Sequence, residues 1–145
     1  MKKMITTALL LSALTVGASG CANSQSQANS TDTQSLSGKW QVVRIDNQAV
    51  SRDDYQVSFN AENKSVYAYF GCNRFRGAYT QQADKLQFSQ LASTMMMCVN
   101  IEDENRAKAA LTDTRQWRNL NQDGGLVQLL DGNAKVRLEL KPTAE

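Results

Sequence analysis

Alternation of apolar and polar residues with a period of two runs through most of the chain after residue 36. Tyr55, Val57 and Phe59 alternate with polar neighbours, as in strands that bury one face and expose the other. The same pattern recurs at 66–70, 75–79, 86–88 and 136–140, and further strands are expected at 40–45 and 126–130. Asp131-Gly132-Asn133 separates the segments 126–130 and 136–140 and predicts a hairpin. The pattern therefore predicts mainly antiparallel β-structure.

One segment, Ile101–Arg118, departs from this pattern. Its buried-type positions recur at helical spacing: Ala107, Ala110, Leu111, Thr114 and Trp117. This spacing predicts one amphipathic helix whose narrow apolar face covers the open side of a curled sheet. The expected fold class is α+β, a small curved antiparallel β-sheet with one amphipathic helix packed across it.

The first twenty residues have the layout of a secretory signal peptide. Lys2 and Lys3 precede a short, mostly apolar run, and small residues then lead to Cys21. The run is too short to span a hydrocarbon core of ~30 Å comfortably. The residues before Cys21 resemble a bacterial lipobox, which predicts a signal peptide at 1–20 and a lipid (palmitate) on Cys21. The alternative is ordinary cleavage nearby, with Cys21 left as a free thiol.

The segment that follows is expected to be a tether. Residues 22–35 contain no large apolar side chain and cannot bury enough surface to fold. We therefore expect a lipidated N-terminus and flexible tether at 21–35 and one domain at 36–142. Ala22 is not the aspartate that retains many lipoproteins at the inner membrane, so we expect an outer-membrane anchor with the domain facing the periplasm.

The charge balance argues against a nucleic-acid partner. Removal of Lys2 and Lys3 with the signal peptide takes two of the 16 basic residues and leaves 14, equal to the 14 acidic residues. No excess of positive charge then remains to bind phosphates.

Cys72 and Cys98 are predicted to form a disulfide. They enclose 25 residues, and two such cysteines in an oxidising compartment most often pair. A loop of this length is expected to stabilise the fold by ~3 kcal/mol. A reactive dithiol and two separate buried thiols are the alternatives.

Residues that would carry catalysis or bind metal are not found. The chain has no histidine, which excludes Ser-His and Cys-His nucleophile pairs, although catalysis by carboxylates alone stays open. Met95-Met96-Met97 contains soft ligands for copper(I), but consecutive strand residues point to alternating faces. Met96 is therefore expected in the core, with Met95 and Met97 on the other face. We predict no catalytic residue, no metal site and no cofactor.

The sequence does not predict a calcium-binding loop. Asn119-x-Asn121-x-Asp123-Gly124 resembles the start of such a loop, but the first ligand is not acidic and Leu130 stands where a glutamate is needed. Two turns flanking a strand explain these residues better.

Several short motifs together resemble the META domain family, which includes the HslJ heat-shock lipoproteins. The residues that carry the resemblance are Leu36, Gly38, Trp40, Gly71-Cys72-Asn73, Phe75, Gly77, Tyr79, Ala92-Ser93-Thr94, Met96, Cys98 and Glu104, followed by a closing hairpin at Leu129–Leu140. Gly71, Asn73, Gly77, Thr94 and Met96 are taken as the family-motif residues. Met95 stands where the family often has a basic residue, and Met97 where it usually has alanine.

The resemblance implies a curved sheet with a helix across it and an envelope role linked to heat shock and novobiocin resistance. It implies no agreed enzymatic activity. We therefore expect a non-enzymatic outer-membrane lipoprotein involved in the envelope stress response or in tolerance to novobiocin-type antibiotics. The alternative is a pilotin-like lipoprotein chaperone for outer-membrane secretin assembly. The expected partners are the membrane, through the lipid on Cys21, and an envelope protein or small apolar ligand.

The glycines around Cys72 allow two interpretations. They form a tight bend beside the disulfide, or they help to shape an apolar groove beside the helix. The groove would be lined by Phe70, Phe75, Tyr79 and Trp117. It would take an acyl chain, an amphipathic partner helix or an aromatic antibiotic.

Overall fold

The computed structural model describes residues 35–120 and 125–143. The predicted signal peptide and lipid site, residues 22–34 of the predicted tether, and residues 121–124 of the rejected calcium loop lie outside the described residues. The elements follow in chain order: β1 (Gly38–Ile45), β2 (Gln48–Ala49), β3 (Gln56–Asn60), β4 (Ser65–Tyr69), β5 (Arg74–Gln82), β6 (Lys85–Phe88), β7 (Ala92–Ser93), α1 (Glu102–Asp113), β8 (Thr114–Asn119), β9 (Val127–Asp131) and β10 (Val136–Pro142). The predicted hairpin at residues 126–140 is confirmed as β9 and β10.

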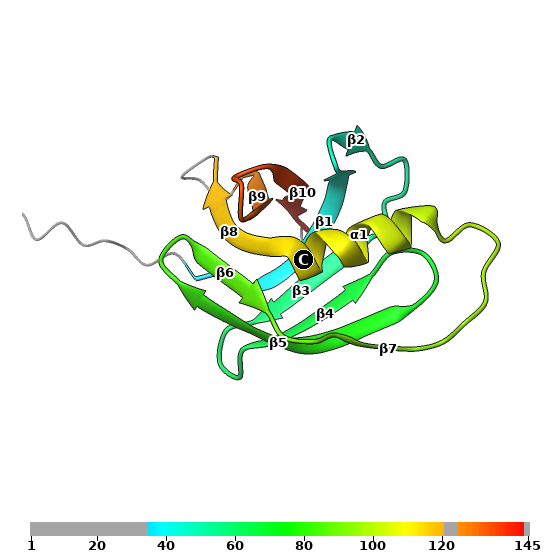
Figure 1. The fold of residues 1–145 in the computed structure, drawn as a ribbon, viewed down its shortest axis with the longest axis horizontal. Coiled ribbons are helices and arrows are strands. Elements are labelled where there is room, and N and C mark those ends of the chain that lie inside the picture. The colour runs from blue at the N-terminus through cyan, green and yellow to red at the C-terminus, as the bar shows by residue number, and fades with distance from the viewer. Residues whose placement is uncertain (1–34, 121–124, 144–145) are drawn as a thin grey trace, which may run out of the picture. The chain divides into compact units, whose positions relative to one another are not determined.

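The strands close into a barrel rather than forming an open sheet. β1 pairs antiparallel with β3 on one edge and with β10 on the other. The order β10-β9-β8-β6-β5-β4-β3-β1 therefore returns to its start, which makes an eight-stranded barrel within residues 35–120 and 125–143 (Figure 1). The expected α+β fold with a small curved sheet is wrong. Alternation identifies strands, but it does not reveal that Trp40 pairs with Pro142.

Closure is accompanied by bulges and by a cluster of ion pairs. Register shifts occur in β1, β8 and β10, and bulges of this kind bend and twist strands at barrel corners. Arg137 on β10 binds Asp46 at 2.5 Å and Asp113 at 2.6 Å. The hydrogen bond to Asp46 is the main cause that raises the pKa of Arg137. These contacts tie β10 to the turn after β1 and to the end of α1.

The barrel interior is filled by the inward side chains of alternating strand positions. They include Val42, Ile45, Val57, Phe59, Val66, Ala68, Phe75, Tyr79, Leu86, Leu129, Leu138 and Leu140, all 5% exposed or less. Full burial of one such Val, Leu, Ile or Phe side chain is worth about 1.5–3 kcal/mol. The interior is thus a packed core.

The helix is shorter than expected, because the chain turns into a strand at Thr114. The ψ of Thr114 is 131°, outside the helical region, and its hydroxyl donates to the Ala110 carbonyl at 2.8 Å. Trp117, expected on the helix, lies on β8. A bulge at the start of β8 buries both Thr114 and Trp117. These two residues are three positions apart, which is also the spacing of residues on one face of a helix.

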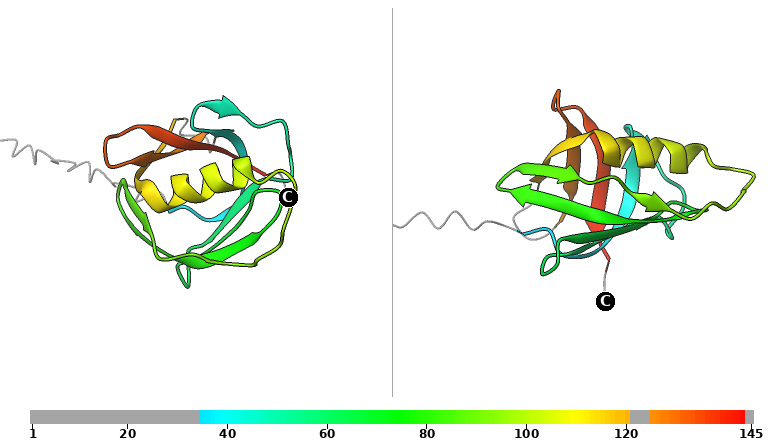
Figure 2. Two further views of the ribbon diagram at one scale, coloured as in Figure 1. Left: turned by 45° about the vertical axis from the view of Figure 1, so that its right-hand side comes forward. Right: turned by 60° about the horizontal axis from the view of Figure 1, so that its bottom comes forward.

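Helix α1 lies across one end of the barrel (Figure 2, left). Its buried residues Ala107, Ala110 and Leu111 face the core, and it packs against β1, β6, β9 and β10. Alanine at two of these positions lets the helix approach the strand ends closely. Among the residues described, no helix is both long and apolar enough to cross a membrane.

Candidate functional site

The predicted disulfide between Cys72 and Cys98 is present. Their Cα atoms are 6.0 Å apart, and the bond joins the β4–β5 connection to the loop that precedes α1. Cys72 is buried. The bond thereby fixes the loop between β7 and α1 against the barrel.

Asn73 links three segments through hydrogen bonds. Its backbone N–H and its Nδ2 donate to the Glu104 carboxylate at 2.5 and 2.7 Å. Its Oδ1 accepts from the Met96 N–H at 2.7 Å and from the Thr94 hydroxyl at 2.9 Å. Asn73 and Glu104 are only 8% and 4% exposed. We call Cys72, Asn73, Thr94, Cys98 and Glu104 the motif cluster, because motif residues dispersed along the chain meet here to hold the loop and α1 on the barrel.

Glu104 is a member of this cluster that sequence reasoning did not assign to a site. It shares one helix face with Ala107 and Leu111, at positions i+3 and i+7. A buried carboxylate needs hydrogen-bond donors from the protein. The position of Glu104 on the apolar face of the helix was therefore a sequence signal that could have identified it as a site residue.

Packing, rather than ligand access, explains the two motif glycines. Gly71 has a φ of +104°, and a Cβ there would lie 3.0 Å from the Tyr55 ring. A Cβ on Gly77 would lie 2.7 Å from Leu91 Cδ2. These contacts agree with the tight-bend interpretation. The expected core position of Met96 is wrong, because the triplet lies in a loop after β7 and Met96 is 57% exposed.

The four residues predicted to line an apolar groove lie in the barrel core. Phe70, Phe75, Tyr79 and Trp117 are 7% exposed or less. The Tyr79 hydroxyl donates to the Leu36 carbonyl at 3.1 Å, and burial raises the Tyr79 pKa. Trp117 Nε1 donates to the Ala83 carbonyl at 2.7 Å, across the short β6–β8 pairing. The space between these elements is therefore filled by the protein's own side chains, and binding there stays a prediction.

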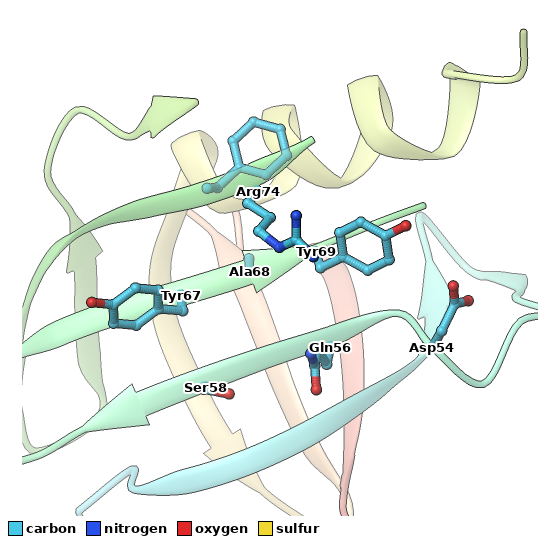
Figure 3. Close-up of a pocket in the computed structure, with 8 residues that line it drawn as sticks. Asp54, Gln56, Ser58, Tyr67, Ala68, Tyr69 and Arg74 are labelled. Atoms are coloured by element: carbon cyan, nitrogen blue, oxygen red, sulfur yellow. The ribbon is translucent and has the colours of Figure 1, made fainter. Parts of the chain in front are cut away.

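Polar and aromatic side chains form two rows across the outer face of β3, β4 and β5. In one row Gln56 pairs with Tyr69, which pairs with Arg74. In the other row Ser58 pairs with Tyr67, which pairs with Arg76. We call these six residues the Tyr–Arg face. Figure 3 shows Tyr67 and Tyr69 side by side along β4, between β3 and the strand that carries Arg74.

Each arginine of this face lies against the tyrosine opposite it. Arg74 Cζ is 5.8 Å from the Tyr69 ring centre, and Arg76 Cζ is 5.2 Å from that of Tyr67. Within residues 35–120 and 125–143, none of the ion pairs involves Arg74 or Arg76. Their guanidinium groups thus stay available to an acidic partner.

A depression of about 550 Å³ lies on this face (Figure 3). Its floor and walls include Gln56, Ser58, Tyr67, Tyr69 and Arg74. At its border Asp54 is bound by Arg52 through two hydrogen bonds, and the bond to Arg52 holds the Asp54 pKa below its usual range. Negative charge at this border is thereby already neutralised.

This arrangement is suited to binding. Tyrosine rings stack on flat or apolar ring surfaces, and arginine binds carboxylates, phosphates or acidic hydroxyl groups. The part of the chain that the structure describes holds no cluster of three or more histidine, cysteine or acidic residues that could bind a metal ion.

The META domain family model matches residues 32–144. The chain belongs to this family. The match spans the barrel, the motif cluster and the Tyr–Arg face of this META domain. No curated protein matches the chain.

Solved structures share the fold of this META domain at low sequence identity. A protein from Burkholderia xenovorans, solved by NMR, is 22% identical with a TM-score of 0.63, covering 79% of this chain and 88% of its own. A second protein solved by NMR is 24% identical with a TM-score of 0.57, covering 77% and 93%. A DUF4847 family protein from Bacteroides vulgatus ATCC 8482 is 11% identical with a TM-score of 0.54, covering 76% and 95%. At these identities the likeness shows the fold alone.

Sequence reasoning did not nominate Tyr67 and Tyr69 of this META domain as site residues. The available signal was that the segment 66–70 carries bulky residues on both faces. Val66, Ala68 and Phe70 fill the core, so Tyr67 and Tyr69 must point outward. Large aromatic residues on the outer face of a strand are candidates for binding.

Proposed function

We propose that this META domain is a non-enzymatic module, anchored by lipid to the outer membrane, that binds an aromatic, acidic ligand on its Tyr–Arg face. Through this binding it supports the envelope stress response or tolerance to novobiocin-type antibiotics. The stress and antibiotic roles rest on the family resemblance, and the ligand chemistry rests on the face itself.

One observation carries the proposal: two Tyr–Arg pairs stand in register on an outer strand surface, while the core is already filled. Tyr67 is 49% exposed although it is a large aromatic residue. Neither it nor Arg76 is part of the hydrophobic core. Because the core forms without Tyr67 and Arg76, we expect these side chains to contact another molecule.

Titration calorimetry of the full-length protein in detergent tests this proposal, with novobiocin as the probe. We expect binding by the wild type and about tenfold or greater weakening in the Arg74→Gln/Arg76→Gln double variant, because two cation contacts are lost. Lys108→Gln is the matched control, since it removes a cation from the exposed side of α1. Equal affinity in the double variant and the control, or no binding by the wild type, would contradict the proposed ligand chemistry.

The lipid anchor is tested separately by Cys21→Ser. If Cys21 carries the lipid, this variant leaves the membrane fraction and keeps the unfolding midpoint of the wild-type domain. A variant that stays in the membrane pellet would show that the anchor lies elsewhere.

The pilotin-like alternative shares the same anchor and differs in the partner. It requires binding to the C-terminal segment of a secretin, and loss of the protein would then mislocalise that secretin. Crosslinking in intact membranes followed by purification distinguishes the two functions. Recovery of a secretin, with no novobiocin binding, would favour the alternative.

A further inference from the structure

The loop between β7 and α1 displays three consecutive methionines to solvent. Met95 is 97% exposed, Met96 57% and Met97 102%. The loop extends beyond the barrel in Figures 1 and 2. None of the three side chains is part of the hydrophobic core.

The backbone of this loop is nevertheless held firmly. The Met96 N–H donates to Asn73 Oδ1 at 2.7 Å, and the Met96 carbonyl accepts from Asn73 Nδ2 at 3.4 Å. Cys98, immediately after the triplet, is bonded to Cys72. The loop is thus fixed through its backbone and its disulfide, while the thioether groups point away from these contacts into solvent.

Within residues 35–120 and 125–143, the triplet also contains the sulfur atoms most open to oxidation. The chain has five methionines and three cysteines; Met1 and Met4 lie in the predicted signal peptide, and Cys21 is the predicted lipid site. Cys72 and Cys98 are already oxidised to a disulfide. Methionine oxidises more readily the more its sulfur is exposed, so a two-electron oxidant should act first on Met95 and Met97.

We propose that Met95, Met96 and Met97 form a reversible oxidation site for two-electron oxidants such as hydrogen peroxide. The thioether sulfur attacks one peroxide oxygen, an S–O bond forms and the O–O bond breaks. The departing hydroxide takes up the remaining proton to give water. Sulfur loses two electrons, the peroxide is reduced, and each methionine becomes a sulfoxide.

The fold tolerates this change, which distinguishes the site from a methionine in a core. A sulfoxide is polar and disrupts packing when it forms in a protein interior. Here no packing is lost, and the hydrogen bonds that hold Met96 use only backbone atoms. The protein therefore accepts oxygen at all three positions and stays folded, while the apolar surface of the loop becomes polar. Exposure of the sulfoxides also leaves them accessible to methionine sulfoxide reductases, which are specific for one epimer each.

Peptide-resolved mass spectrometry of the full-length protein treated with hydrogen peroxide tests the proposal. We expect oxidation rates at Met95 and Met97 within about twofold of those in the urea-unfolded, disulfide-intact protein, and a slower rate at the half-exposed Met96. The unfolding midpoint of the oxidised protein should move by less than about 3 °C. Reductases of both epimer specificities, added to the folded protein, should together remove the added oxygen.

Met95→Leu/Met97→Leu is the matched variant, because it keeps apolar side chains of similar size. It should lose two of the three oxygen additions and keep the wild-type unfolding midpoint. The proposal would be overturned by tenfold or greater protection of Met95 and Met97 in the folded protein. It would also be overturned by unfolding on oxidation, or by sulfoxides that the reductases remove only after unfolding.

Discussion

Two polar groups of residues meet where β4 joins β5, and they have opposite surroundings. Asn73 points inward to Glu104 and is 8% exposed, whereas Arg74, the next residue, is exposed on the outer face beside Tyr69. The motif cluster satisfies its hydrogen bonds within the protein. The Tyr–Arg face leaves donors and aromatic surface open to other molecules.

The residues that identify the family therefore differ from the residues proposed to bind a ligand. Asn73, Thr94 and both cysteines belong to the motifs that carry the resemblance, and their contacts hold the scaffold together. Tyr67 and Tyr69 belong to none of those motifs. The comparison therefore predicts that changes in the motif cluster destabilise the protein, while changes in the Tyr–Arg face mainly affect binding.

The largest effect is expected from Asn73→Ala. This change removes the side-chain amide that donates to Glu104 and accepts from Thr94 and Met96, and it leaves a buried carboxylate with one donor fewer. We expect a loss of about 3–5 kcal/mol in the free energy of unfolding, measured by urea denaturation. Asn105→Ala, on the exposed side of α1, is the control and should cost less than about 1 kcal/mol. Similar losses in both variants would show that the cluster does not hold the scaffold.

Removal of the disulfide should have the next largest effect. Cys72→Ser/Cys98→Ser releases the constraint on the loop between β7 and α1, and the chain-entropy model gives a loss of about 3 kcal/mol. In a domain of this size the unfolding midpoint should fall by about 10 °C or more, measured by calorimetry. Recovery of two free thiols from the mature protein, isolated without reductant, would refute the bond.

The smallest effect on stability is expected from the outer face. Tyr67→Ser/Arg76→Gln removes one cation–π contact between exposed side chains, worth less than about 1 kcal/mol. The same variant should weaken novobiocin binding about tenfold in titration calorimetry. If it unfolds the domain instead, these side chains serve the scaffold, and the contrast between the two groups fails.

The sequence predicted local elements better than their assembly. The strands and the hairpin could be predicted because their signals come from residues close together in sequence. These signals are the alternation at Tyr55–Phe59 and the turn Asp131-Gly132-Asn133. Closure depends on β1 meeting β10, and no local pattern encodes this pairing. The end of α1 was missed because a bulge in β8 spaces Thr114 and Trp117 as a helix would.

The candidate site was predicted only in part, for a related reason. Two cysteines in the domain and an expected oxidising compartment were enough to predict the disulfide. Alternation did not show that Phe70, Phe75 and Tyr79, predicted to line a groove, lie in the hydrophobic core of a closed barrel. Once the barrel is closed, the outward residues of the same strands become the available surface, and they could be identified only after the inward face was known.

Pairing between the first and last strands of the barrel also affects how the protein folds as it emerges. Until residue 142 is available, one edge of β1 has no partner, and neither does one edge of β9. Contacts between residues so far apart in sequence make folding slow, because most of the chain must be ordered before they form. A chain that is still emerging therefore cannot complete its barrel. Folding is deferred until the C-terminus has arrived, and a truncation before β10 should leave two open edges that promote aggregation.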